Sequence, residues 1–247
     1  VTHEQYLHYL NDLIANQREN EALARVPRFP ARSGRVEDPI YEFARTKKGG
    51  CWNLPKQARD LTLHPDAPVV LVTWLDAQCY CQWHAKKTQL PWRLPGEFER
   101  EKAARGVDGR QFPWGEFADP AFHCEENSVL TGSGAPPANQ FHIDESPYGV
   151  MGLAGGVQEW CADIFSPEGP PRKGSKAITP QPPEKQLEVQ AHAARRAVRS
   201  GAWNLPSRYG RTASRTAAPP LRRSSNLGFR ICRSGPFSSA LSFSDED

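Results

Sequence analysis

Apolar residues recur at helical spacing near the start of the chain. From Tyr6 to Ile14 they mark one face of a helix, and Thr2-x-x-Gln5 just before them has the form of a capping box. We therefore expect a helix over residues 3–15. Residues 16–63 carry no such period and are interrupted by prolines, so we expect an irregular stretch there.

A β-branched run and two further helix signals follow. Residues 68–72, with the sequence Pro-Val-Val-Leu-Val, predict a short buried strand. Thr73, with Asp76 three residues later, predicts the start of a second helix. The stretch 93–101 has a proline and several acidic residues that suit the first turn of a third helix, which we expect to end at Gly106.

The last part of the chain has a regular frame around an irregular middle. Residues 195–203 and 226–230 are apolar, aromatic and glycine-bearing, which favours two strand-like anchors. Between them, residues 204–225 show neither a helical nor a strand period and predict a long exposed connection. Loops longer than about 12–15 residues in a compact domain are usually functional or disordered. Because this one is held at both ends, we favour a functional role.

Composition narrows the class of protein. The 247 residues, 38% hydrophobic and 24% charged, are typical of a soluble domain, and no run of about 18 apolar residues predicts membrane insertion. The chain starts without a signal peptide and inside a capping box, which suggests a piece of a longer protein. Its six cysteines are scattered without paired C-x-x-C units, which favours a reduced, cytoplasmic protein. Surface display by a longer parent protein stays open.

Positive charge is concentrated near the C-terminus, although the net charge is only +3. No Asp or Glu occurs from Val189 to Gly235, and the ten arginines there are Arg195, Arg196, Arg199, Arg208, Arg211, Arg215, Arg222, Arg223, Arg230 and Arg233. A phosphate or nucleic-acid site is one interpretation. We prefer another, in which several of these arginines pair with carboxylates elsewhere, such as those from Glu97 to Glu101. No nucleic-acid partner is therefore expected.

Six motifs occur together and in order along the chain. They are Thr2-x-x-Gln-Tyr, Pro68-Val-Val-x-Val-x-Trp74-x-Asp-Ala, Arg93-Leu-Pro-x-Glu-Phe-Glu, Phe112-Pro-Trp-Gly, Tyr148-Gly-Val-x-Gly-Leu-Ala-Gly-x-Val-x-Glu-Trp160 and Arg199-x-Gly-x-Trp203 with Asn226-Leu-Gly-Phe-Arg230. This set resembles the formylglycine-generating-enzyme (sulfatase-modifying-factor) family. The resemblance implies an α+β, C-type lectin-like fold with little regular secondary structure, flanking helices and short twisted antiparallel strands. It implies one domain over residues 1–233, with a solvent loop at 166–190 and a Ser-rich acidic tail at 234–247.

The enzymes of this family carry two copper-binding cysteines after the position of Trp203. By resemblance they would fall at Leu205 and Gly210 here, and neither residue supplies a thiolate. Cys232 lies past the closing strand. The family's iron-dependent sulfoxide synthases need a three-histidine site, and the histidines of this chain show no such pattern. We therefore expect a protein that is not an enzyme, with no catalytic residue and no metal cofactor.

The resemblance also extends to non-catalytic variable proteins made by diversity-generating retroelements. In them the segment equivalent to residues 203–226 displays changeable side chains that bind a ligand. The expected ligand-binding residues, for an unknown protein ligand, are Asn204, Leu205, Pro206, Arg208, Tyr209, Arg211, Ser214, Leu221, Arg222, Ser224 and Ser225. Gly201, Trp203, Gly228 and Phe229 are expected to form the scaffold of this site.

Calcium is the other ion that the resemblance implies. The family's site would use a side-chain oxygen at the position of Gly152, the carbonyls of Gly155 and Val157, and the carboxylate of Glu159. Calcium prefers six to eight oxygen ligands. With glycine at 152, Glu159 is the single carboxylate, and it is also free to pair with an arginine. We therefore expect no bound calcium, with Glu159 as a weak candidate ligand.

Three functions stay open from the sequence. The favoured one is a non-catalytic, ligand-binding domain with a variable surface at 203–226. The second is a metal-dependent oxidoreductase of the formylglycine-generating or sulfoxide synthase type. The third is an accessory domain of a larger signalling protein.

Overall fold

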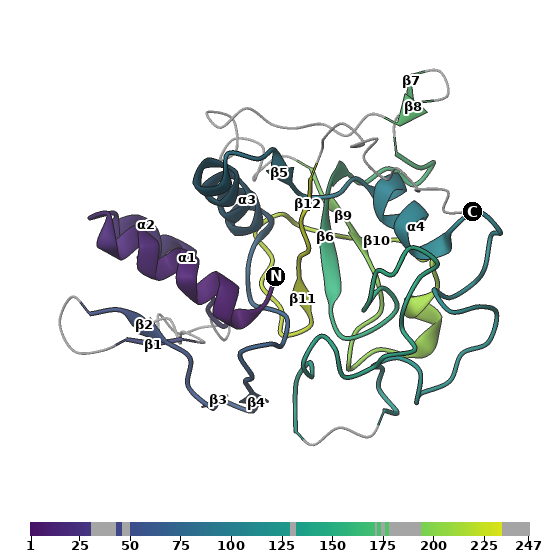
Figure 1. Ribbon diagram of the computed structural model, residues 1–247, viewed down its shortest axis with the longest axis horizontal. Helices are drawn as coiled ribbons and strands as arrows, with labels where there is room; N and C mark the ends of the chain where they lie inside the picture. The colour runs from purple at the N-terminus through teal and green to yellow at the C-terminus, as the bar shows by residue number, and fades with distance from the viewer. Residues whose placement is uncertain are drawn as a thin grey trace, which may run out of the picture.

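In the part of the chain that the structure describes, a small mixed sheet lies between three α-helices on one side and one α-helix on the other. The computed structural model describes residues 1–30, 43–45, 50–128, 132–170, 172–173, 176–177 and 194–233. Helices α1 (His3–Ala15), α2 (Glu19–Arg25) and α3 (Trp74–Thr88) lie on one side of the sheet, and α4 (Glu97–Arg105) lies on the other (Figure 1).

The sheet has four strands, β6 (Gln158–Ile164), β9 (Arg196–Arg199), β10 (Thr216–Ala218) and β11 (Leu227–Gly228), in the order β10-β9-β6-β11. The β10-β9 and β9-β6 pairs are antiparallel, and β11 runs parallel to β6. The two expected anchors thus contain strands β9 and β11, on either side of β6. Strand β6 itself was not predicted, because its short apolar run stands almost directly after the glycines at 155 and 156 and no clear strand start is visible in the sequence.

The remaining strands are pairs of two residues each. They are β1 (Ala44–Arg45) with β2 (Trp52–Asn53), β3 (Gln57–Ala58) with β4 (Leu61–Thr62), β5 (Trp92–Arg93) with β12 (Cys232–Arg233), and β7 (Arg172–Lys173) with β8 (Lys176–Ala177). The β7-β8 pair lies within the loop expected at 166–190. The rest of that loop beyond residue 170, and the tail at 234–247, lie outside the described residues.

Helix α1 has the predicted bounds because its capping box forms. The Thr2 hydroxyl accepts from the N–H of Gln5, and the Gln5 side chain accepts from the N–H of Thr2. The buried face includes Tyr6 and Leu10. Thr73 and Asp76 cap α3 in the same way, and α4 ends before Gly106, whose φ of 68° suits glycine. All three predicted helices are confirmed.

The expectation of an irregular stretch from 16 to 63 is wrong at α2. This helix has one buried residue, Ala22, so its sequence shows no apolar period. Gln17, with φ of 61°, separates it from α1 by a left-handed residue.

Residues 69–72 are buried as expected and Pro68 is half-buried, but residues 68–72 do not form a strand. Leu71 has φ of 58°, which breaks an extended conformation. The N–H of Leu71 donates to the carbonyl of Ser224, and the N–H of Val69 donates to the carbonyl of Val1. The β-branched residues thus reflect burial, while the backbone pairs with separate loops.

Tryptophans join the sheet to this buried segment and to α3. The indole of Trp160 in β6 donates to the carbonyl of Val72, and the indole of Trp74 donates to the carbonyl of Cys161. The guanidinium of Arg196 lies 3.8 Å from the centre of the Trp74 ring. The position of the sheet against α3 is therefore set by aromatic side chains that are fully buried.

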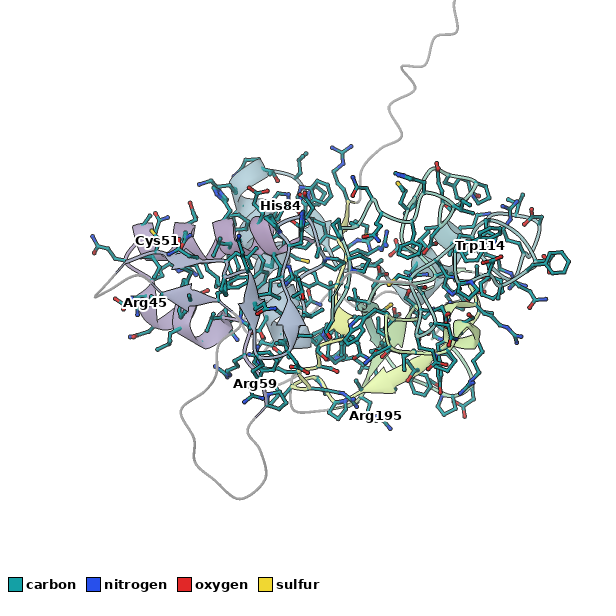
Figure 2. The ribbon with its side chains drawn as sticks, turned by 90° about the horizontal axis from the view of Figure 1, so that it is seen from below. Arg45, Cys51, Arg59, His84, Trp114 and Arg195 are labelled. Carbon is teal, nitrogen blue, oxygen red and sulfur yellow. The ribbon has the colours of Figure 1, made fainter. Side chains whose placement is uncertain are left out.

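The molecule is elongated, with its N-terminal helices near one end. Figure 2 shows Arg45 and Cys51 at this end and Trp114 towards the other.

All six cysteines are free thiols. None of the helices in the described part of the chain is long and apolar enough to cross a membrane.

Candidate functional site

The segment 203–226 begins where two glycines enclose one carbonyl group. The N–H of Gly201 donates to the carbonyl of Ala154 at 3.2 Å. A Cβ at Gly201 would lie 2.6 Å from this oxygen, and a Cβ at Gly210 would lie 2.4 Å from it. Ordinary Cβ atoms do not approach so closely, so both positions require glycine for this backbone to persist.

The far end of the segment is held against the core. A Cβ at Gly228 would lie 2.3 Å from the carbonyl of Val69. Phe229 is 2% exposed and packs edge-on against the rings of Tyr6 and Tyr80. Trp203 connects the two ends, because its indole donates to the carbonyl of Ser225 at 3.1 Å.

The ligand-binding residues expected from the sequence all retain solvent contact. Asn204, Arg208, Arg211, Leu221 and Arg222 are exposed. The other six, Leu205, Pro206, Tyr209, Ser214, Ser224 and Ser225, are half-buried. We call these eleven residues the display surface.

The display surface is not one continuous loop, which corrects the sequence expectation. A 3-10 helix, η2 (Ser207–Gly210), and strand β10 lie within the segment 203–226. The two ends of this segment meet where the Asn226 side chain donates to the Asn204 side chain at 2.9 Å. The short lengths of η2 and β10 explain why no period marks them in the sequence.

Four arginines of the same region pair with carboxylates, as preferred from the sequence. The pairs are Arg199–Glu101, Arg215–Glu97, Arg223–Asp76 and Arg230–Glu159. Two of the four carboxylates, Glu97 and Glu101, lie in α4, so their pairs connect that helix to β9 and to the segment that follows it. They hold the inner side of the segment and leave its outer side to solvent.

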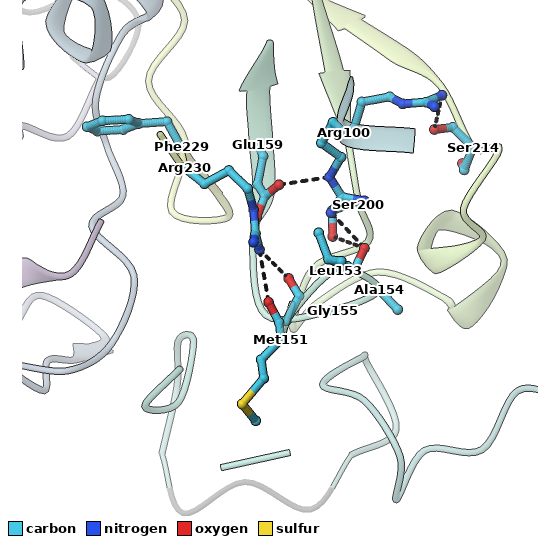
Figure 3. Close-up of polar contacts among 12 residues, drawn as sticks. Arg100, Met151, Leu153, Ala154, Gly155, Glu159, Ser200, Ser214, Phe229 and Arg230 are labelled. Atoms are coloured by element: carbon cyan, nitrogen blue, oxygen red, sulfur yellow. Dashed lines mark hydrogen bonds and ion pairs between the residues drawn. The ribbon is translucent and has the colours of Figure 1, made fainter. Parts of the chain in front are cut away.

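Glu159 lies between two guanidinium groups in the middle of the sheet (Figure 3). Its carboxylate accepts from Arg100 at 2.9 Å and from Arg230 at 2.8 Å. Burial opposes ionisation of this carboxyl, but Arg230 and Arg100 outweigh burial and lower the pKa of Glu159 below its ordinary value. Pairing of Glu159 with arginine, one of the two roles considered from the sequence, is thus the one observed.

The donor set expected for calcium does not fit that ion here. Arg230 donates to the carbonyls of Met151 and Gly152 at 3.2 and 2.9 Å, and its positive charge lies beside Glu159 (Figure 3). Gly152 has no side-chain oxygen. Among the described residues, no group of three or more His, Cys, Asp or Glu is placed to hold a metal.

A cavity of about 220 Å³ lies beside this network. Asp144 and Cys124 line it together with Phe141, Met151 and Arg230. Burial raises the pKa of the Cys124 thiol to about 12, so this cysteine is not a thiolate at neutral pH.

Asp144 is a buried carboxyl that the sequence did not single out. Its carboxylate accepts from the N–H groups of Leu153, Ala154 and Gly155 at 3.0–3.1 Å. Burial raises its pKa above the ordinary value, against these hydrogen bonds. Asp144 thereby holds the main chain that carries the Ala154 carbonyl. No motif marks this role, since its partners are backbone groups.

The sulfatase-modifying factor enzyme 1-like domain family matches residues 1–235 of the chain. The chain is 33% identical over 208 residues to the formylglycine-generating enzyme of Streptomyces coelicolor, covering 78% of this chain and 61% of the relative. It is 32% identical over 177 residues to inactive C-alpha-formylglycine-generating enzyme 2 of Bos taurus, covering 68% of this chain and 50% of the relative.

The fold is also similar to that of a solved structure. Treponema denticola variable protein 1 superposes with a TM-score of 0.54 at 21% identity, covering 69% of this chain and 72% of that one. The chain spans 61%, 62% and 48% of the lengths of three formylglycine-generating enzymes that it matches. The chain belongs to the formylglycine-generating-enzyme family, the sulfatase-modifying factor enzyme 1-like family, and has the C-type lectin-like fold expected from its motifs.

Proposed function

We propose that this domain is non-catalytic and binds a protein ligand through the display surface. The observation that carries the proposal is the packing at Gly210, where a Cβ would stand 2.4 Å from the carbonyl of Ala154. The family's second copper-binding cysteine would fall at this position, and the backbone has no room for any side chain. Leu205 occupies the position of the first cysteine. With the copper site placed in this way, neither position supplies a thiolate.

The side chains of the display surface support a binding role. Tyr209 and the exposed Arg208 are residue types that commonly contribute most to protein interfaces. Leu221, 44% exposed, adds an apolar contact. Because glycines and buried aromatic residues hold the ends of the segment, the outer side chains can change without loss of the frame.

Oxidation of cysteine is the activity to test first. The chain and the Streptomyces coelicolor relative would be loaded with copper and incubated with a cysteine-containing peptide, and aldehyde would be detected by hydrazide labelling. We expect aldehyde with the relative and none with this chain, and no stoichiometric copper bound to it. Aldehyde formation by this chain would refute the proposal that it is non-catalytic, and stoichiometric iron would favour the metal-dependent alternative.

Diversification of the surface is a separate part of the proposal. The gene neighbourhood would be sequenced and searched for a near-copy of the stretch that encodes Trp203–Arg230, beside a reverse transcriptase. We expect the two copies to differ at adenines, in codons for display-surface residues. Without such a copy the retroelement origin is wrong, and the domain is a fixed binding or accessory module.

A further inference from the structure

Arginines near the display surface fall into two groups. Those that face the core are neutralised, as in Arg215, which donates to both carboxylate oxygens of Glu97 at 2.6 and 2.9 Å. Arg223 likewise lies 2.8 Å from Asp76, whose side chain is 1% exposed. Glu97 and Asp76 are therefore already paired with inner arginines.

The outer arginines have no such partner. Arg208, Arg211 and Arg222 are exposed, and none of the carboxylates in the described residues forms an ion pair with them. The guanidinium of Arg208 lies 5.0 Å from the centre of the Tyr209 ring, which limits the orientations of its side chain. A guanidinium held in this way loses less entropy when it binds a carboxylate.

Few acidic residues lie near these arginines in the described part of the chain. The chain has no Asp or Glu from Val189 to Gly235. Glu126 is next to the surface, since its N–H donates to the carbonyl of Leu205, but its exposed carboxylate forms no ion pair among the described residues. The display surface thus carries three positive charges that no carboxylate in the described part of the chain neutralises by an ion pair.

We propose that the partner of this domain is a protein with an acidic segment that binds the display surface through Arg208, Arg211 and Arg222. This inference rests on the proposed function and adds the chemistry of the partner. The guanidinium groups bind carboxylates of the segment, and Tyr209 and Leu221 contact its apolar side chains. Opposite charge on the partner provides specificity and speeds association.

A nucleic acid fits this surface less well. Proteins that bind DNA through its backbone use about six to ten phosphate contacts. Three unpaired arginines are fewer than this. Single-stranded nucleic acids also stack their bases on aromatic side chains. Tyr209, the one tyrosine of the display surface, is half-buried beside Arg208. An acidic peptide needs fewer contacts and matches the mixture of cationic and apolar groups.

A displayed dodecapeptide library with random sequence tests the inference. Enriched peptides would be synthesised, labelled and titrated by fluorescence anisotropy against the chain and two pairs of variants. R208Q/R211Q removes two charges from the display surface, and Y209A/L221A removes its apolar contacts. The matched control K56Q/R233Q removes two exposed positive charges, beside β3 and in β12, away from η2 (Figure 1). Neither forms an ion pair among the described residues.

We expect the enriched peptides to be rich in Asp and Glu. They should bind R208Q/R211Q about ten-fold more weakly than the unchanged chain, and K56Q/R233Q within about two-fold of it. Peptides without excess acid that lose affinity only in Y209A/L221A would refute the acidic partner but keep the display surface. Peptides that are insensitive to both variants, or no enrichment at all, would refute the proposed binding function as well. Tighter binding of a single-stranded oligonucleotide of equal charge would refute a protein partner.

Discussion

The main chain of Gly210 rests on the carbonyl group of Ala154, and a Cβ at Gly210 would stand 2.4 Å from that oxygen. Gly201 also lies close to this oxygen and donates its N–H to it. One carbonyl therefore determines where the display surface begins and where η2 ends. This contact links the glycine at position 210, where we propose that a copper-binding cysteine is missing, to the stability of the fold.

Replacement of Gly210 by cysteine should destabilise the domain. The new side chain must push the backbone away from Ala154, and we expect a loss of about 3 kcal/mol in the free energy of unfolding, or roughly 6–12 °C in Tm. Thermal unfolding followed by circular dichroism measures the change.

Leu205→Cys is the control, because Leu205 is half-buried and a smaller side chain fits there. We expect it to unfold within about 1 kcal/mol of the unchanged chain. Equal stability of both cysteine variants would mean that Gly210 is not constrained by packing.

Replacing Glu159 by a neutral residue should lower the free energy of unfolding more than replacing an exposed acidic residue. Glu159→Gln leaves Arg100 and Arg230 without their counter-charge, and Arg100 is 2% exposed. Removing one partner of a buried ion pair costs about 3–5 kcal/mol. Glu21→Gln, which removes the exposed pair with Arg18, should cost less than about 1 kcal/mol. Urea unfolding of the two variants side by side checks the difference, and similar costs would argue against a structural role for Glu159.

Local signals predicted the helices well. The capping boxes at Thr2 and Thr73 act within one helical turn, so four residues are enough to locate a helix start. The run at 69–72 misled because β-branched residues fit any buried segment, and the left-handed residue Leu71 leaves no mark in the sequence. Helix α2 was missed because a helix with one buried residue has no apolar face.

The candidate site could be predicted in part. Pairing of several C-terminal arginines with acids elsewhere was preferred because these arginines are spaced through loop and strand and do not cluster on one helix face. Glu97 and Glu101 of α4 are among the partners observed. Asp144 could not be found, because it binds N–H groups and no side chain partner fixes its spacing. The constraint on Gly210 also depends on the fold, since Ala154 is distant in the sequence.

Stability should fall as the solution becomes mildly acidic, through His123. Burial lowers the pKa of His123 below its ordinary value, against a smaller raising effect of Asp144. Below about pH 6.5 the unfolded chain binds a proton that the folded chain does not, so stability is lost as pH falls towards the folded pKa. The slope is at most about 1.4 kcal/mol per pH unit for one proton.

His123→Phe should flatten the pH dependence of stability between about pH 7 and pH 5, because phenylalanine keeps the contacts with Phe112 and Trp114 and does not titrate. The control is His142→Gln at an exposed position, which should leave the slope unchanged. Urea titrations at several pH values measure it. An unchanged slope in His123→Phe would exclude His123 as the group responsible.

Calcium should not stabilise the domain. The guanidinium of Arg230 occupies the carbonyls of Met151 and Gly152 and neutralises Glu159, so a cation would have to displace a buried ion pair. We expect the Tm in millimolar calcium chloride to equal that in excess chelator. A saturable rise in Tm with calcium, absent with magnesium, would show that the ion binds.

Side chains of the display surface should be replaceable together at little cost to the fold. In the variant with Arg208, Arg211, Leu221 and Arg222 all changed to serine, exposed groups without ion-pair partners are removed. We expect the free energy of unfolding to change by less than about 1 kcal/mol.

The frame around that surface should respond in the opposite way. Gly228→Ala, a single small change, places a Cβ 2.3 Å from the carbonyl of Val69. We expect Gly228→Ala to lower the free energy of unfolding by about 3 kcal/mol, more than the four surface substitutions together. The parallel pairing of β11 with β6 leaves little room for the backbone to move. Thermal unfolding of the two variants compares surface and frame directly. If the four serine substitutions lower the free energy of unfolding as much as Gly228→Ala does, the outer side chains contribute to the stability of the fold. The proposal that this surface can vary in sequence would then be wrong.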